Sequence, residues 1–152
     1  MLPSRLDEIL KAAADPTRLR LLNLLCLGSI RVCDLQAVLR IPQPSVSRHL
    51  AALRHPGLVT DVREGTHISY SLTPATTPQV EALHDLLDRC CSEDAVMRAD
   101  IVRLRDAVNA GTCRLETAGT ETSPLPERKL RASRPENGPG SKNTGEEDAG
   151  TG

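Results

Sequence analysis

The sequence almost entirely lacks aromatic residues. Its 152 residues include no Trp, no Phe and a single Tyr, at position 70. Proteins that hold single-stranded nucleic acid stack the bases on aromatic rings, so this composition argues against that class. Duplex DNA, in contrast, can be bound without aromatic rings. Because aromatic residues are so few, the core must be built from aliphatic side chains, and we expect Tyr70 to belong to it.

Long apolar runs are also missing. Charged residues interrupt every hydrophobic segment, so none approaches the roughly 18 residues that would cross a bilayer. Residues 1–5 lead into an amphipathic pattern without the apolar stretch of a secretory signal. Five cysteines, an odd number, in such a chain indicate reduced thiols rather than disulfides. We expect a cytoplasmic protein with no membrane partner.

The net charge of −1 is unevenly distributed along the chain. Residues 1–115 contain 14 Lys and Arg against 13 Asp and Glu, whereas residues 116–152 contain 5 against 7. The apolar pattern ends near Cys113, and Gly, Pro, Ser, Thr and Glu dominate beyond it. We expect one domain over residues 1–112 and a disordered tail over residues 113–152.

Apolar residues recur at helical spacing in the first third of the chain. The pattern predicts helices over residues 6–13, 16–27, 32–39 and 43–55. Asp15 is expected to cap the second of them, because Pro16 follows it in the first helical position. The last carries Val46, Leu50 and Leu53 on one face and polar residues on the other. Two such short helices in succession predict a helix-turn-helix, whose second helix enters the major groove of DNA.

A hairpin and two more helices are expected after this unit. Residues 58–63 and 67–72 alternate as β-strands do, around a loop that contains Gly65. A helix that begins near Pro78 should end at Cys90 and Cys91, and a further helix should follow over residues 94–109. The expected fold class is mainly α with a small β-hairpin, a winged helix-turn-helix.

Four segments of the sequence, in this order, resemble the arsenic-responsive repressor family of the ArsR/SmtB type. They are ADPTRLRLL (14–22), VCDL (32–35), QPSVSRHL (43–50) and LRHPGLV (53–59). The resemblance spans roughly residues 5–90 and leaves the tail outside. It implies a dimeric repressor that releases its operator when a metal or metalloid binds cysteine, histidine or carboxylate ligands. It does not identify the ion.

The same resemblance makes residues 43–55 the recognition helix. The residues nearest the DNA would be Gln43, Ser45, Ser47, Arg48 and His49 on this helix, with Arg63 and His67 on the wing. Arg48 can bind either a guanine edge or a phosphate. His49 has two interpretations of equal weight, a DNA contact or a structural histidine beside the turn between the helices.

The family's usual thiol site is incomplete in this chain. Many members carry CVCDLC in the third helix, where three thiolates bind trivalent arsenic or antimony. The corresponding segment here is RVCDLQ (31–36), which retains only Cys33, and neither Arg nor Gln replaces a soft sulfur donor. Cys26 lies on an apolar helix face and is expected in the core.

Cys90 and Cys91 are the stronger candidates for binding an inducer. Some relatives bind trivalent arsenic through such a pair at a helix end, together with a later cysteine. Cys113 would be that third ligand, supplied by the other subunit because a straight helix of about 24 Å separates it from its own pair. Cys33 is the reserve candidate. Incidental surface thiols are the alternative interpretation of the pair.

The expected function is a metalloid-responsive transcriptional repressor, not an enzyme, that binds operator DNA as a homodimer. It has no permanent cofactor, and trivalent arsenic or antimony releases it from the DNA. A thiol-based redox sensor, or a sensor of cadmium or lead, is the alternative. A cysteine-dependent oxidoreductase is disfavoured, since no phosphate-binding glycine loop or nucleophile-and-base pair is visible. A protein-interaction adaptor with the same fold is a further rival.

The dimer interface has several candidate residues, each of which could belong to the monomer core instead. These are Leu6, Ile9, Val80, Leu83 and Leu87.

Overall fold

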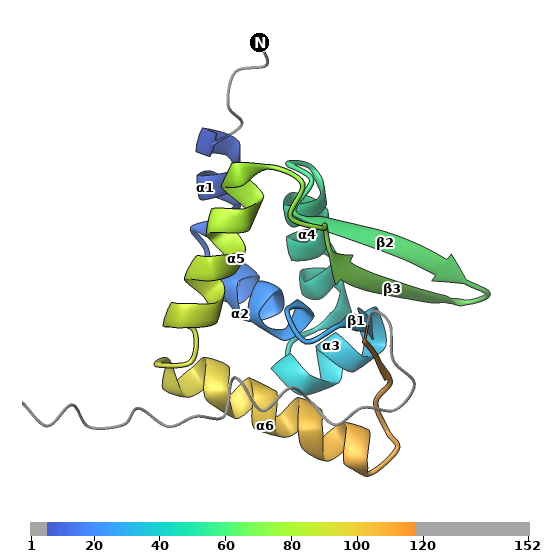
Figure 1. The fold of residues 1–152 in the computed structure, drawn as a ribbon. Coiled ribbons are helices and arrows are strands. Elements are labelled where there is room, and N and C mark those ends of the chain that lie inside the picture. Colours follow the sequence, from blue (N-terminus) through green and yellow to red (C-terminus); the bar gives the residue numbers. More distant parts are fainter. Residues whose placement is uncertain (1–5, 118–152) are drawn as a thin grey trace, which may run out of the picture.

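The computed structural model describes residues 6–117, which form a helical body with a projecting hairpin (Figure 1). The predicted helices and hairpin are confirmed to within a few residues, and no helix in this part of the chain is both long and apolar enough to cross a membrane. Of the expected tail, residues 118–152 lie outside the described residues. The helices are α1 (Leu6–Ala13), α2 (Pro16–Leu25), α3 (Val32–Leu39), α4 (Gln43–Arg54), α5 (Pro78–Cys90) and α6 (Ala95–Asn109). The strands are β1 (Ser29–Arg31), β2 (Val59–Glu64), β3 (His67–Leu72) and β4 (Leu115–Glu116).

Side-chain caps fix where three of the helices begin, and two of these caps are carboxylates. The Asp15 carboxylate accepts a hydrogen bond of 2.9 Å from the backbone N–H of Arg18, which confirms its predicted role at the start of α2. Asp94 accepts one of 2.9 Å from the N–H of Met97 at the start of α6. Each carboxylate satisfies an N–H group that has no partner inside its helix.

All four strands belong to one antiparallel sheet in the order β2, β3, β1, β4. The wing is the β2–β3 pair, and β1 continues the sheet by pairing Ile30 with Tyr70. On its other side β1 pairs Ile30 with Leu115 of β4. Strands this short carry no two-residue alternation, so the sequence did not predict β1 or β4. Ordered contacts therefore continue past the domain boundary expected at residue 112.

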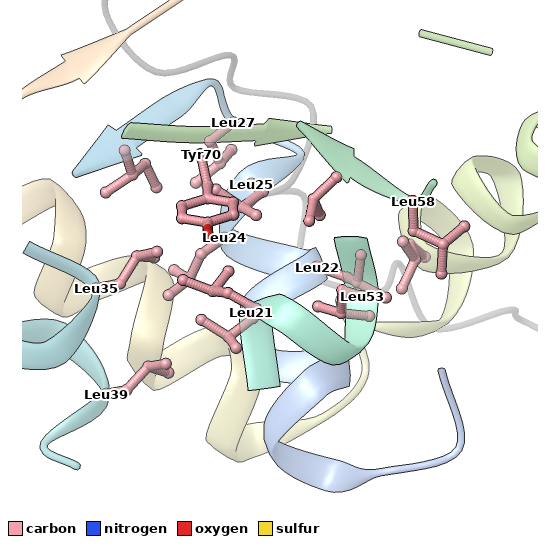
Figure 2. Close-up of a cluster of buried hydrophobic side chains, with 14 of the residues drawn as sticks. Leu21, Leu22, Leu24, Leu25, Leu27, Leu35, Leu39, Leu53, Leu58 and Tyr70 are labelled. Atoms are coloured by element: carbon pink, nitrogen blue, oxygen red, sulfur yellow. The ribbon is translucent and has the colours of Figure 1, made fainter. Parts of the chain in front are cut away.

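The core is aliphatic and lies where α2, α3 and α4 meet the sheet. Figure 2 shows leucines of these helices in one cluster with the ring of Tyr70, which is 9% exposed and confirms the expected core position. Cys26 is half-buried and packs against the same cluster, in line with its expected place. Burial of this set holds the two helices of the helix-turn-helix at a fixed angle.

Helix α6 lies across α2 and α3 (Figure 1). A buried ionic group attaches it to both of these helices. Asp100 has no exposed surface and accepts two hydrogen bonds from the Arg20 guanidinium, at 2.7 and 2.8 Å. Arg103 also donates to Asp100, and its Nε donates to the Val38 carbonyl at 2.8 Å. Sequence pattern does not reveal how α6 meets its neighbours, because Arg20 lies on α2 and Val38 on α3, far from Asp100 and Arg103 in the sequence.

Candidate nucleic-acid interface

Helix α4 turns one face to the core and the other to solvent. Pro42 precedes it and Pro44 lies in its first turn, where a missing N–H costs no helical hydrogen bond. Val46, Leu50 and Leu53 are buried without residual exposure. The opposite face therefore presents polar side chains, as the helical spacing predicted.

A groove of about 260 Å³ lies between α4 and the sheet. We call it the α4–wing groove. Three residues predicted to contact DNA share it, namely Gln43 and Ser47 of α4 and His67 of the wing. Amide, hydroxyl and imidazole groups all bind base edges or phosphates, and none requires an aromatic platform. The lining residues are Arg31, Val32, Cys33, Gln43, Ser47, Thr66, His67, Ile68 and Tyr70.

Four other predicted contacts lie outside this groove, namely Ser45, Arg48, His49 and Arg63. Arg48 is exposed on α4, and its Nη2 lies 3.5 Å from the Oγ of the half-buried Ser45. Arg63 is exposed on β2 beside the wing loop. The predicted set is therefore divided between residues that line the groove and residues outside it, which include both arginines.

His49 lies against the start of α2. Its Nδ1 is 3.7 Å from Asp15 Oδ1, and both side chains are about a quarter exposed, at 25% and 29%. The Arg18 N–H, and then the nearby charge of His49, lower the pKa of Asp15 below its ordinary value. This placement favours the structural interpretation of His49, in which it joins α4 to α2.

Sequence analysis missed Arg31, which lines the α4–wing groove. Its Nε donates to Asp34 Oδ2 at 2.8 Å, and this hydrogen bond raises the pKa of the guanidinium. Asp34 itself is buried, with 5% exposure. The only signal that places Arg31 at the groove is the pairing of β1 with β3, which the sequence pattern does not reveal.

The cysteines fall into two separate places. Cys90 is the exposed last residue of α5, whereas Cys91 is its buried C-cap. Cys113 is buried beside Asp34 and Cys33 of its own chain, and burial, followed by the Asp34 carboxylate, raises the pKa of its thiol to about 12. Within residues 6–117 no three Cys, His, Asp or Glu side chains are grouped so as to hold a metal ion.

Sequence comparisons place this arrangement among bacterial regulators. A sequence profile described as "Bacterial regulatory protein, arsR family" matches residues 15–61, from the start of α2 into β2. The "Arsenical resistance operon repressor" of Escherichia coli (strain K12) is 42% identical over 94 residues, which cover 61% of this chain and 78% of that protein. The "Arsenic resistance transcriptional regulator ArsR2" of Pseudomonas putida is 35% identical over 94 residues, 61% of this chain and 79% of that protein.

A solved structure agrees with these matches. The crystal structure of the transcriptional repressor BigR from Xylella fastidiosa superposes with a TM-score of 0.51 at 30% identity, covering 58% of this chain and 85% of that one. All of these proteins are transcription regulators rather than enzymes, and a helix-turn-helix with a wing is the DNA-binding part of such proteins. The chain therefore belongs to the arsR family of bacterial regulatory proteins.

Proposed function

We propose that this chain is a metalloid-responsive repressor that binds duplex operator DNA as a homodimer. Trivalent arsenic or antimony, bound by the thiolates of Cys90 and Cys91, releases it. The observation that carries the proposal is the α4–wing groove, with Gln43, Ser47 and His67 in one place. The relatives named for arsenic resistance support the inducer.

In this proposal α4 enters the major groove with its polar face toward the base edges. Gln43 and Ser47 offer groups that bind bases or phosphates, and Arg48 offers a fork of N–H donors that matches guanine. Arg63 and His67, which flank the loop at the wing tip, contact the phosphate backbone or the adjacent minor groove. Half of the contacts in such interfaces go to the backbone, so the wing sets the register in which α4 reads the sequence.

The dimer is proposed to form through α1 and α5. Leu6 and Leu10 of α1 are 44% and 54% exposed, and Leu86 of α5 is 52% exposed. Large apolar side chains exposed on two helices favour association with a second copy, whose α4 can then reach the next major groove about 34 Å away. The other predicted interface candidates are buried in the chain's own core, and these are Ile9, Val80, Leu83 and Leu87.

Substituting one exposed leucine tests this interface. Leu86→Asp should give a monomer in sedimentation velocity, because a carboxylate is costly to bury at an apolar contact. Val102→Asp is the matched control on α6, where Val102 is 39% exposed. Equal dimer content in both variants would overturn the α1–α5 interface.

The proposed inducer site lies where α5 ends and the chain turns toward α6. Soft thiolates suit trivalent arsenic and antimony better than nitrogen or carboxylate ligands do. Cys90 is already exposed, whereas Cys91 must leave the core before both sulfurs reach one ion. The third ligand predicted from the sequence, Cys113 of a second subunit, would have to leave its buried position near Asp34. The proposal therefore rests on the pair.

A short chain of contacts connects this site to the DNA-binding helices. The Asn23 side-chain amide of α2 donates to the Met97 carbonyl in the first turn of α6, at 3.4 Å. One turn further on, Asp100 binds Arg20 of α2. Withdrawing Cys91 from the core moves the start of α6, and with it the support behind α2 and α3. The same contacts carry the effect of the inducer to α4.

Fluorescence anisotropy with an operator duplex tests the inducer site. The duplex is selected from a random pool by its binding to the protein, and arsenite is then titrated into the complex. The double variant Cys90→Ser, Cys91→Ser should bind the duplex with unchanged affinity and remain bound in arsenite. Cys26→Ala is the control that should be released like the original protein. Full release of the double variant would overturn the site, and retention by Cys113→Ser would add Cys113 to it.

A further inference from the structure

Two cysteines that are 80 residues apart in sequence meet at one buried carboxylate. Cys33 Sγ lies 3.8 Å from Asp34 Oδ1, and the buried Cys113 thiol lies close enough to the same carboxylate for its negative charge to raise the pKa of the thiol. The backbone N–H of Arg114 also donates to Asp34 Oδ2, at 3.1 Å, which holds the segment that carries Cys113. We call Cys33, Asp34 and Cys113 the Asp34 cluster. Both of its sulfurs belong to one protomer.

The two thiols differ in what can reach them. Cys33 is exposed in the first turn of α3 and lines the α4–wing groove. Cys113 is 8% exposed and stays protonated at neutral pH, because burial and Asp34 raise its pKa to about 12. Hydrogen peroxide in solution therefore reaches the exposed Cys33 sulfur and not Cys113, which is buried and protonated. Attack by peroxide turns Cys33 into a sulfenic acid, and Cys113 is the nearby thiol that can react with it.

We propose that the Asp34 cluster is an oxidation site, at which hydrogen peroxide converts Cys33 and Cys113 into an intramolecular disulfide that weakens DNA binding. The consequence for DNA rests on the function proposed above, whereas formation of the disulfide does not. This site shares no residue with the Cys90–Cys91 pair, which lies at the other end of α6, a helix of about 22 Å.

The chemistry balances with hydrogen peroxide as the two-electron oxidant. The Cys33 thiolate attacks one peroxide oxygen, the O–O bond breaks, and the products are a sulfenic acid and, after protonation of the hydroxide, water. The Cys113 sulfur then attacks the Cys33 sulfur as its proton passes to the nearby Asp34 carboxylate. The S–OH bond breaks, and the departing hydroxide takes up that proton to give a second water. Two thiols and one peroxide thus yield one disulfide and two waters.

Formation of this bond changes the α4–wing groove through Asp34. In the reduced protein both sulfurs are neighbours of the Asp34 carboxylate. An S–S bond of about 2 Å between them requires this carboxylate to move. Asp34 is the partner of Arg31, which lines the groove, and of the Arg114 N–H. The disulfide therefore releases Arg31 and shifts the start of α3 beneath the surface that Gln43 and Ser47 present to DNA.

Peptide mapping tests the disulfide itself on the full-length protein. Trypsin releases each thiol in a short peptide, residues 32–40 for Cys33 and residues 106–114 for Cys113. After treatment with hydrogen peroxide, these two peptides should be joined, with the loss of two hydrogen masses, and dithiothreitol should separate them. Cys33→Ser and Cys113→Ser should each abolish the joined peptide, whereas Cys26→Ala should not. Its absence from the oxidised original protein would overturn the proposal, even if operator binding stands.

Anisotropy with the selected duplex tests the consequence. Oxidation should weaken binding by about tenfold or more, within the range usual for coupled sites, and dithiothreitol should restore it. Cys33→Ser, whose side chain is exposed and whose substitution should not disturb folding, should bind equally well with and without peroxide. The double variant at Cys90 and Cys91 should respond to peroxide like the original protein. Full peroxide sensitivity in Cys113→Ser that remains folded by circular dichroism would assign the effect to Cys33 alone and overturn the pair.

Discussion

The α4–wing region and the α6–β4 region of this molecule are built on different principles. In the first, Gln43, Ser47 and Arg48 are exposed and only the opposite face of α4 packs. In the second, charges and a thiol are buried and paired with residues 80 positions away in the sequence, as in Arg20 with Asp100. An exposed polar face costs little stability and is available for binding, whereas buried polar groups hold distant segments together. Substitutions in the first region should therefore change affinity, and those in the second should change stability.

The largest effect should come from the buried carboxylate of α6. Asp100→Asn leaves Arg20 and Arg103 without their anionic partner, and breaking a buried ion pair typically costs about 3–5 kcal/mol. Urea unfolding followed by circular dichroism measures this loss. Asp106→Asn, at an exposed position of the same helix, is the matched control and should lie within about 0.5 kcal/mol of the original protein. Equal free energies of unfolding for the two variants would contradict the claim that the buried charges of α6 stabilise the fold.

Arg48→Ala should weaken DNA binding without lowering stability, the opposite of Asp100→Asn. Losing a guanidinium that reads a base should weaken operator binding by about 1–3 kcal/mol while leaving the free energy of unfolding almost unchanged. Anisotropy titrations at several salt concentrations measure it, since a phosphate contact would instead lower the salt slope by about one. Arg98→Ala, at an exposed position of α6, is the control. Unchanged affinity in Arg48→Ala would remove this residue from the interface.

Gly28→Ala should separate β4 from the sheet. An added Cβ would lie 2.5 Å from the Glu116 carbonyl oxygen, and the φ of +151° is unfavourable for other residues. We expect a loss of about 1–2 kcal/mol together with faster alkylation of Cys113 in the native protein. Gly57→Ala, at a φ of +79° with no atom within 4 Å, carries backbone strain without the clash. Alkylation that is equally slow in both variants would show that β4 does not protect Cys113.

Asp15→Ala should have the smallest effect, about 1 kcal/mol, as is usual for the loss of an N-cap. The Arg18 N–H lowers the pKa of Asp15 in the folded state, so its contribution is complete above the unfolded pKa near 3.9. The contribution is lost as the pH falls through the folded pKa. Urea unfolding should therefore show the difference from the original protein at pH 7 and a smaller one at pH 3. A difference that persists at the lower pH would point to packing instead of the carboxylate.

Sequence pattern predicted the first region well because its determinants are local. The spacing of Val46, Leu50 and Leu53 defines the buried face of α4, and whatever lies opposite must be exposed. The cap at Asp15 and the alternation of the wing strands are equally local. Contacts between residues within about a dozen positions produce a periodic pattern of apolar residues in the sequence. These elements could therefore be predicted without a structure.

The rest depends on which segments meet in space. Nothing near Cys113 indicates that it lies beside Asp34, because β4 has two residues and pairs with β1 across the whole domain. His49 had two interpretations from sequence, a DNA contact or a structural histidine, and its position 3.7 Å from Asp15 could not be read from the sequence pattern. The apolar face of α5 likewise does not indicate whether it packs against the same chain or against a second copy of it.

Photocrosslinking tests most directly whether α4 faces the DNA. Ser47→p-benzoylphenylalanine on α4 and Val102→p-benzoylphenylalanine on α6 are each irradiated in complex with the selected duplex, after anisotropy has verified that both remain bound. The proposed orientation predicts protein–DNA adducts at position 47 and none at position 102. Adducts at position 102, with none at position 47, would contradict it.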